Sequence, residues 1–324
     1  MKEVAFIRQR IEKWRKYESV AASPELTTAD EMTDAYIDVT SDLAFARTHY
    51  PHSRITLYLN NMASAIHNSI YRNKRERLSR IFTFWTTEMP HIVWEARREL
   101  RLSLLIFVVC ALIGAFSQWC DPEFARHVMG DAYVDMTLEN IADGEPMAVY
   151  ATGPSSQAFT SITINNIYVS FLCFVSGVLT SFATGFLLLS NGVMVGCFQT
   201  FFIQKDLFWP SFLAIWLHGT IEISSIIVAG AAGITMGNGW LFPGSYPRLY
   251  AFRRGAMRGL KIVIGTMPLF VIAGFIESYL TRHTEWPDAV RGAIILCSFL
   301  FIVFYYIVLP YIKFGNHGHS KSEN

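Results

Sequence analysis

Hydrophobic and polar positions divide the chain into an amphipathic first part and a mainly apolar remainder. Up to residue 101, apolar residues recur every three or four positions, which is the spacing of one helix face. Because helices with one apolar face bury it against one another, we predict a helical bundle over residues 1–101. Its last stretch, Ile81–Leu100, is amphipathic and is expected to lie at a membrane surface or to run into the first span. The apolar faces are Phe6, Ile7, Ile11 and Trp14, then Met32, Tyr36, Val39, Leu43 and Ala46, then Ile55, Leu59, Met62, Ile66 and Ile70.

Uncharged runs long enough to cross a bilayer follow. The first is Leu102–Trp119. No charged residue occurs from Ile162 to Gln204, so we predict a span of about 26 residues there, a turn at Ser190–Gly192, and a second span or a half-helix from Val193. Six spans are preferred, and five result if the segment from Val193 only re-enters the membrane. The remaining spans are Phe212–Met236, Ile262–Leu280 and Gly292–Ile312.

The charge of the connecting segments predicts the orientation. The loop 120–163 holds seven acidic residues and one base, Arg126, whereas the Gly- and Pro-rich loop 237–261 holds five bases. Because cytoplasmic loops carry the excess of Lys and Arg, both termini are expected in the cytoplasm, which requires six spans. We therefore predict an all-α membrane protein with a cytoplasmic helical domain (1–101), a transmembrane domain (102–312) with an extracytoplasmic loop (120–163), and a cytoplasmic polar tail (313–324).

Composition supports a polytopic membrane protein. The chain is 52% hydrophobic and 16% charged, whereas soluble domains carry roughly 25% charged residues. Its five cysteines form no CxxC pair and are interpreted as small apolar fillers.

Small residues spaced by four predict close helix packing within the bilayer. A homo-oligomer, in which such residues of two copies pack together, is also possible. Gly177, Ser181 and Gly185 are expected on one span, Gly192 and Gly196 on the next, and Ala229, Gly233 and Gly237 on the fourth.

Two acids and a histidine in the apolar segments are the candidate functional groups. His218 and Glu222 share one helix face because they lie four residues apart, and Glu277 lies near the end of the fifth span. A carboxylate in hydrocarbon costs at least about 2.5 kcal/mol, so these groups should face protein or water and could converge. Gly219 lies between the first two, and Asn191 and Gly192 mark the predicted turn.

Four hypotheses fit these groups: a hydrogen-bonded cross-link between spans, a proton or cation path, a metal site formed by His218, Glu222 and Glu277, and intramembrane hydrolysis. One His and two Glu are a plausible zinc-type ligand set, although their spacing matches no fixed motif. Neither HExxH nor GxSxG occurs. We expect no enzymatic activity and no cofactor.

The basic run Arg72–Arg80 is interpreted as a solvated face or as a contact with anionic lipid headgroups. Residues 1–101 carry 16 Lys and Arg against 13 Asp and Glu, an excess too small to predict binding to nucleic acid.

Several segments resemble the stage II sporulation protein M family of integral membrane proteins. They are "SDLAFARTHYPHSRITLYLNNMASAIHNSIYR", "NNIYVSFLCFVSGVLTSFATGFLLLSNGVMVG", "WLHGTIEISSIIVAGAAG" and "GFIESYLT". The resemblance falls on His218, Gly219, Glu222 and Glu277, with Asn191 and Gly192 at the turn. The N-terminal region and the acidic loop look larger here than in the compact sporulation member.

The resemblance implies a bacterial inner-membrane protein that works with partners. In spore formers the partners are a sporulation protein D-like peptidoglycan hydrolase and a protein P. Elsewhere, relatives are often encoded beside MoxR-type AAA ATPases, RDD-type membrane proteins and proteins with von Willebrand-type domains. The leading prediction is a non-enzymatic component of a cell-envelope or envelope-remodelling complex. The alternative is a proton- or cation-coupled transporter or channel that uses Glu222, Glu277 and His218.

Overall fold

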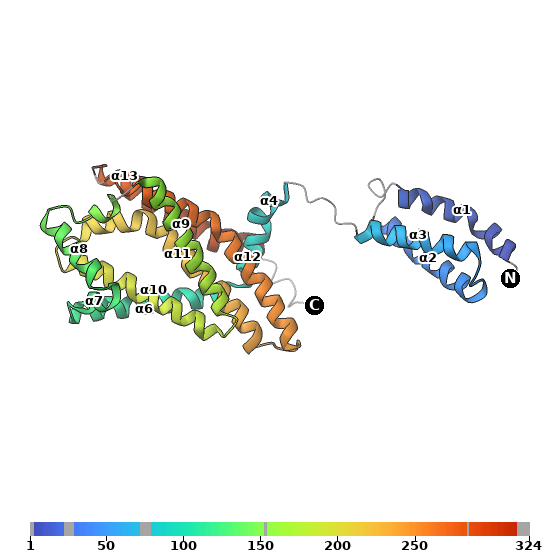
Figure 1. Ribbon diagram of the computed structural model, residues 1–324, viewed down its shortest axis with the longest axis horizontal. Coiled ribbons are helices and arrows are strands. Elements are labelled where there is room, and N and C mark those ends of the chain that lie inside the picture. The colour runs from blue at the N-terminus through green and yellow to red at the C-terminus, as the bar shows by residue number, and fades with distance from the viewer. Residues whose placement is uncertain (1–2, 23–28, 72–78, 152–153, 284, 316–324) are drawn as a thin grey trace. The chain divides into compact units, whose positions relative to one another are not determined.

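The computed structural model describes residues 3–22, 29–71, 79–151, 154–283 and 285–315. These residues form helices and connecting turns, with no β-strand among them. The chain divides into two compact units, Met1–Arg80 and Ile81–Asn324 (Figure 1). The all-α class that the sequence predicts is therefore confirmed.

The first unit is a bundle of α1 (Glu3–Ala22), α2 (Ala29–His49) and α3 (Arg54–Tyr71). Trp14, Val39, Leu59 and Ile66 are fully buried in its core, so the helical spacing in the sequence marked the buried faces correctly. This unit ends at Arg80, whereas the sequence pattern predicts an N-terminal domain that extends to residue 101.

The second unit holds six helices long and apolar enough to cross a membrane, which agrees with the preferred prediction and makes the chain a multi-pass membrane protein. They are α6 (Arg97–Cys120), α9 (Ser155–Ser176), α10 (Ser181–Ile203), α11 (Phe208–Leu241), α12 (Arg248–Phe275) continued by the π-helical η3 (Ile276–Leu280), and α13 (Asp288–Val303) continued by η4 (Phe304–Val308) and α14 (Leu309–Phe314).

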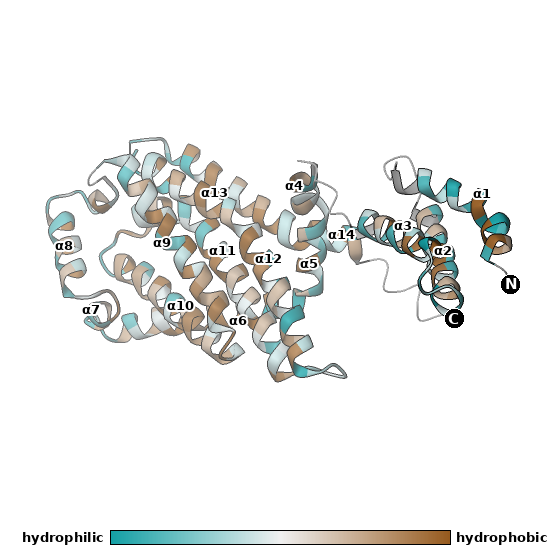
Figure 2. Ribbon diagram, turned by 45° about the vertical axis from the view of Figure 1, so that its right-hand side comes forward, coloured by the Kyte–Doolittle hydropathy of each residue, from teal (hydrophilic) through white to brown (hydrophobic). Residues whose placement is uncertain are grey.

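The central helix of this unit is α11. It is the most buried of the six and packs against α6, α9, α10, α12 and α13. The least buried is α13, whose residues Leu296, Phe299 and Leu300 are exposed and whose ribbon is mostly hydrophobic (Figure 2). Because exposed apolar side chains are expected where a helix meets lipid, α13 lies at the periphery of the bundle.

Glycines permit two of the closest helix contacts. A Cβ added to Gly196 of α10 would lie 1.8 Å from the carbonyl oxygen of Ala111 on α6. A Cβ added to Gly233 of α11 would lie 2.3 Å from the carbonyl oxygen of Cys173 on α9. Only glycine lets backbones approach this closely. Ala229 is fully buried on the same helix, whereas Gly185 faces open space and contributes no close contact.

The predicted turn at Ser190–Gly192 is wrong. α9 ends at Ser176, and the chain turns over Gly177–Thr180 before α10 begins at Ser181. The helix start is capped, because the Thr180 hydroxyl accepts a hydrogen bond from the Ala183 amide at 3.3 Å. Gly177 thus lies in the turn, whereas Ser181 begins the helix that contains Gly185, so the three residues do not share one span.

Asn191 and Gly192 lie inside α10 for reasons the sequence pattern did not reveal. The Asn191 amide donates to the Leu187 carbonyl one turn earlier, at 2.8 Å. A Cβ on Gly192 would lie 2.7 Å from the Phe107 carbonyl oxygen on α6. The glycine therefore serves helix packing instead of a turn.

Both long loops of the sequence analysis are partly helical. The segment 120–163 contains α7 (Phe124–Met129), α8 (Asp131–Ala142) and the short 3-10 helix η2 (Ala148–Ala151), and α9 begins before it ends. Of the segment 237–261, only residues 242–247 lie between α11 and α12. The stretch expected to be amphipathic forms α4 (Ser79–Thr83), η1 (Phe84–Glu88) and α5 (Met89–Glu95), and α5 packs against α12 and α14. Residues 72–78 of the basic run and 316–324 of the tail lie outside the described residues.

Candidate functional site

Two neighbouring helices bring the candidate site together. α11 supplies His218 and Glu222, which lie one turn apart, and η3 supplies Glu277. η3 is a π-helical turn at the end of α12, a distortion frequent at functional sites. No pattern in the sequence indicates this turn, which changes the direction of the side chains of "IESYL" relative to a continuous α-helix.

The three side chains converge within the bundle. One ligand atom from each of His218, Glu222 and Glu277 lies within 4.8 Å of the other two. The His218 Nε2 atom is 3.9 Å from the Glu277 Oε1 atom, and the two side chains are 7% and 18% exposed. This separation is too long for a hydrogen bond but short enough for strong electrostatic interaction.

Thr281 orients the imidazole. Its Oγ1 atom lies 3.3 Å from the His218 Nδ1 atom and donates its own proton to the Ile276 carbonyl oxygen at 3.2 Å. Since that hydroxyl has a single proton, we assign to His218 the tautomer in which Nδ1–H donates to it. The Nε2 atom of His218 then carries a lone pair, and this lone pair is on the side of Glu277.

Three further residues surround the cluster, and the sequence analysis did not assign them to it. Asn166 of α9 faces Glu222, but its Nδ2 atom completes no hydrogen bond within 3.5 Å. The Tyr150 ring of η2 lies 5.5 Å from the His218 ring between centroids. Tyr133 of α8 is close enough for the charge of Glu277 to raise its pKa. None of the three is recognisable in the sequence, because their proximity depends on how α8, η2 and α9 pack.

Both tyrosines remain protonated near neutral pH. Burial raises the pKa of Tyr133 to about 12, and the Glu277 charge adds to the effect. Burial also raises the pKa of Tyr150 well above its ordinary value, with Tyr133, Glu277 and Glu222 contributing. The two phenols therefore keep their O–H protons at physiological pH.

The other candidate residues do not join the cluster. Gly219 is buried, yet an added Cβ would meet only ordinary contacts at 3.6 Å and beyond, so the structure shows no need for glycine there. Asn191 and Gly192 serve α10 as described above.

The arrangement allows two kinds of chemistry. Three ligand atoms that face one another can bind a cation, and a pair of nearby carboxylates can share or pass a proton. The Thr281 hydroxyl lies within hydrogen-bond distance of both the His218 Nδ1 atom and the Ile276 carbonyl oxygen.

Comparison with known protein families agrees with the fold. The model of the family described as Stage II sporulation protein M matches residues 103–282, which is more than half of the chain and includes α11 and Glu277. A second model, described as Domain of unknown function (DUF8413), matches residues 4–72, which cover the three-helix unit. No curated protein and no solved structure matches the chain. With six helices able to cross a membrane inside and around the matched region, the chain belongs to the stage II sporulation protein M family.

Proposed function

We propose that this protein is a non-enzymatic membrane component of a bacterial cell-envelope complex, held in the cytoplasmic membrane with both termini in the cytoplasm. The observation that carries the proposal is the division into two units. A helical unit with its own buried core is joined to a membrane bundle whose family, as the resemblance implies, works with partners. A separately folded unit of this kind is suited to docking.

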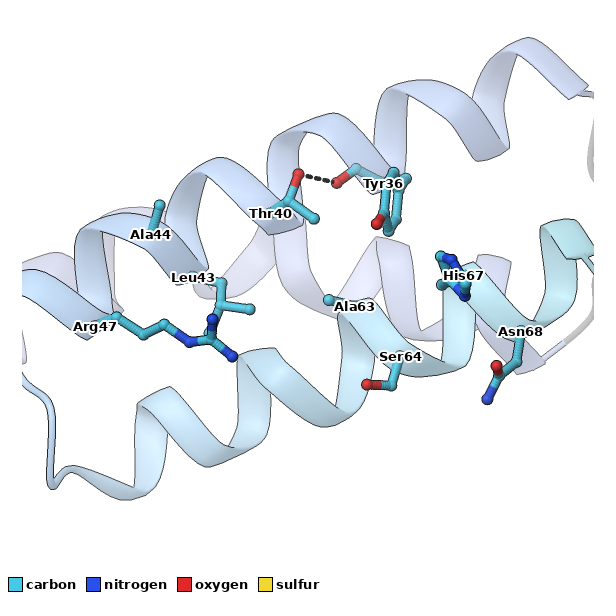
Figure 3. A pocket seen from close by; sticks show the side chains of 9 residues that line it. All are labelled: Tyr36, Thr40, Leu43, Ala44, Arg47, Ala63, Ser64, His67 and Asn68. Atoms are coloured by element: carbon cyan, nitrogen blue, oxygen red, sulfur yellow. Dashed lines mark hydrogen bonds between the residues drawn. The ribbon is translucent and has the colours of Figure 1, made fainter.

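The first unit offers a surface for such docking. A groove of about 700 Å³ runs between α2 and α3, and it is lined by Tyr36, Thr40, Leu43, Ala44, Arg47, Ala63, Ser64, His67 and Asn68 (Figure 3). The Tyr36 and His67 rings lie 5.9 Å apart at one end, and Arg47 lies at the other (Figure 3). Aromatic groups and an arginine are enriched at protein interfaces.

The partners follow from the resemblance. They are envelope or membrane proteins such as MoxR-type AAA ATPases, RDD-type proteins or proteins with von Willebrand-type domains. The membrane bundle would contribute packing surfaces for a membrane partner or a second copy, and the first unit would recruit a soluble partner.

Affinity purification of the full chain from native membranes in mild detergent, followed by mass spectrometry, tests the proposal. We expect stoichiometric partners with the wild type. Ser64→Arg in the groove should lose a soluble partner, whereas Ala65→Arg, on the same helix but outside the groove, should retain it. Recovery of the protein without any partner, at native expression level, would count against the proposal.

A second candidate is a proton- or cation-coupled transporter or channel. Thr163, Asn166 and Ser170 follow one face of α9, and each is buried with a side-chain atom that has no hydrogen-bond partner. A polar face beside buried carboxylates is expected along an ion path. Proteoliposomes containing the purified protein should then show cation or proton flux that Glu222→Gln abolishes and Glu285→Gln leaves intact. Equal flux in empty liposomes would eliminate this candidate.

A further inference from the structure

The cluster on α11 and η3 brings three lone-pair donors together. Nε2 of His218 carries a lone pair because Nδ1–H is used by Thr281. A carboxylate oxygen of Glu277, which is also an acceptor, lies 3.9 Å from Nε2. A carboxylate oxygen of Glu222 completes a set of three lone-pair donors within 4.8 Å. Lone pairs that face one another inside a protein are stabilised by a proton or a metal cation between them.

A second observation points to the same place. Asn166 is 5% exposed, and its amide faces the Glu222 carboxylate without completing a hydrogen bond within 3.5 Å. Carboxylates that bind a metal are usually held by a hydrogen-bond donor behind them. Asn166 is placed to supply that donor to Glu222.

We propose that His218, Glu222 and Glu277 bind a divalent transition-metal ion of the zinc class. The donor set is one imidazole nitrogen and two carboxylate oxygens, which are typical zinc ligands. Two carboxylates and a neutral imidazole carry a charge of −2, so a divalent cation neutralises the cluster without leaving a net charge in the bundle. A proton shared between the two glutamates would neutralise only half of that charge.

The geometry fits an ion of this size. Ligand atoms about 2.1 Å from a tetrahedral zinc ion lie about 3.4 Å from one another. The spacings of 3.9 and up to 4.8 Å exceed that value by little more than 1 Å, which side-chain rotation alone can close. Thr281 supplies the hydrogen bond that metal-binding histidines usually make through their second nitrogen.

The metal would connect α11 to η3 and thus hold the π-helical turn in place. Glu277 lies in that turn, and the sequence after it leads directly to Thr281. One ion therefore organises both the ligands and the residue that orients His218. This inference does not depend on the proposed function, because a metal could serve a scaffold or a transporter equally.

The test measures metal content in the full chain. The protein is purified in mild detergent with a tag that contains no histidine, in a His317→Ala, His319→Ala background that removes the tail histidines. Elemental analysis should find stoichiometric zinc, before or after incubation with ZnCl2 and removal of free metal. The zinc content should fall to background in each of the three cluster variants, Glu222→Gln, Glu277→Gln and His218→Ala. The matched controls are His283→Ala and Glu285→Gln, an exposed His–Glu pair just beyond η3, which should retain zinc.

Two outcomes would overturn the proposal: a wild type that neither contains nor takes up zinc, cobalt or manganese, and metal that is lost equally from cluster and control variants. If the cluster variants fail to fold, the wild type alone decides. Removal of metal by a chelator should lower its melting temperature in detergent, and ZnCl2 should restore it. A wild type whose melting temperature is unchanged by both treatments would also refute the site.

Discussion

At the residue scale, Asp42 holds the first unit together through a buried hydrogen bond. Its side chain is 6% exposed, accepts from the Trp14 indole at 2.9 Å and pairs with Arg10 at 3.3 Å. A buried indole N–H that loses its acceptor costs about 1–3 kcal/mol. Asp42→Ala should therefore destabilise the unit by this amount, seen as faster hydrogen exchange in peptides from α1 to α3 of the full chain.

Asp42→Asn is the matched variant. It keeps an oxygen acceptor for Trp14 and loses only the charge interaction with the half-exposed Arg10, so its effect should be smaller. Equal rates of hydrogen exchange in Asp42→Ala and Asp42→Asn would show that the indole hydrogen bond contributes nothing to stability.

Asp38 should make the stability of the first unit depend on pH. Hydrogen bonds from Lys13 and then Tyr17 hold the pKa of Asp38 below its ordinary value. Because the folded-state pKa is lowered, the stabilisation is present above the unfolded-state pKa and is lost as the pH falls through the folded-state pKa. We expect the free energy of unfolding of the first unit to be higher in the wild type than in Asp38→Asn by at most about 1 kcal/mol near neutral pH. This difference should vanish in acid.

The exposed residue Asp34 on the same helix supplies the control for that comparison. Asp34→Asn should behave as the wild type throughout the pH series, with hydrogen exchange in α1 and α2 as the measurement. A difference between wild type and Asp38→Asn that persists unchanged in acid would contradict the assigned cause.

The residues of the site show what sequence can and cannot predict. His218, Glu222 and Glu277 stand out because charged or titratable groups are costly in apolar segments. Thr281 and Tyr150 do not stand out, since hydroxyl groups are common near helix ends and acquire a role only through tertiary contacts with His218.

At the element scale, the spans were predictable and one turn was not. Length and hydropathy identify six long helices, because a spanning helix must satisfy its own backbone hydrogen bonds. The turn was misplaced because Ser, Asn and Gly are ordinary turn residues in water, whereas Gly192 serves helix contact here. The true turn contains the exposed apolar residues Val178 and Leu179, and its sequence signals are Gly177 and the cap Thr180.

The contact between α6 and α10 depends on Gly196. In Gly196→Ala the new methyl group would meet the Ala111 carbonyl, which is backbone and cannot rotate away. We expect a loss of about 1–3 kcal/mol from this overpacking. Thermal denaturation of the detergent-solubilised protein, followed by gel filtration, should show a lower midpoint.

Gly185→Ala, on the same helix, is the control. Its added Cβ would meet nothing within 4 Å, so the substitution should be neutral or slightly stabilising through helix propensity. A similar fall of the denaturation midpoint in both variants would mean that replacing any glycine of α10 destabilises the protein. The contact with α6 would then not be the cause.

At the scale of the whole molecule, six spans place the two ends of the membrane bundle on opposite sides of the bilayer. α6 ends at Cys120, next to the acidic segment with α7 and α8, which lie together at one end of the bundle (Figure 1). Residues 242–247 connect α11 to α12, and Arg248, Arg253 and Arg254 follow on α12. The excess of basic residues predicts that this connection faces the cytoplasm, together with both termini.

Cysteine labelling of spheroplasts tests that orientation. In a Cys297→Ser background, which removes the other exposed cysteine, a membrane-impermeant maleimide should label the exposed Cys120 from outside. With Cys120→Ser added, Ser245→Cys in the α11–α12 connection should react only after the membrane is permeabilised. Five spans would move this connection to the same side of the membrane as Cys120. Labelling of both positions from outside would therefore contradict six spans. It would also place the first unit and the C-terminus on opposite sides of the membrane.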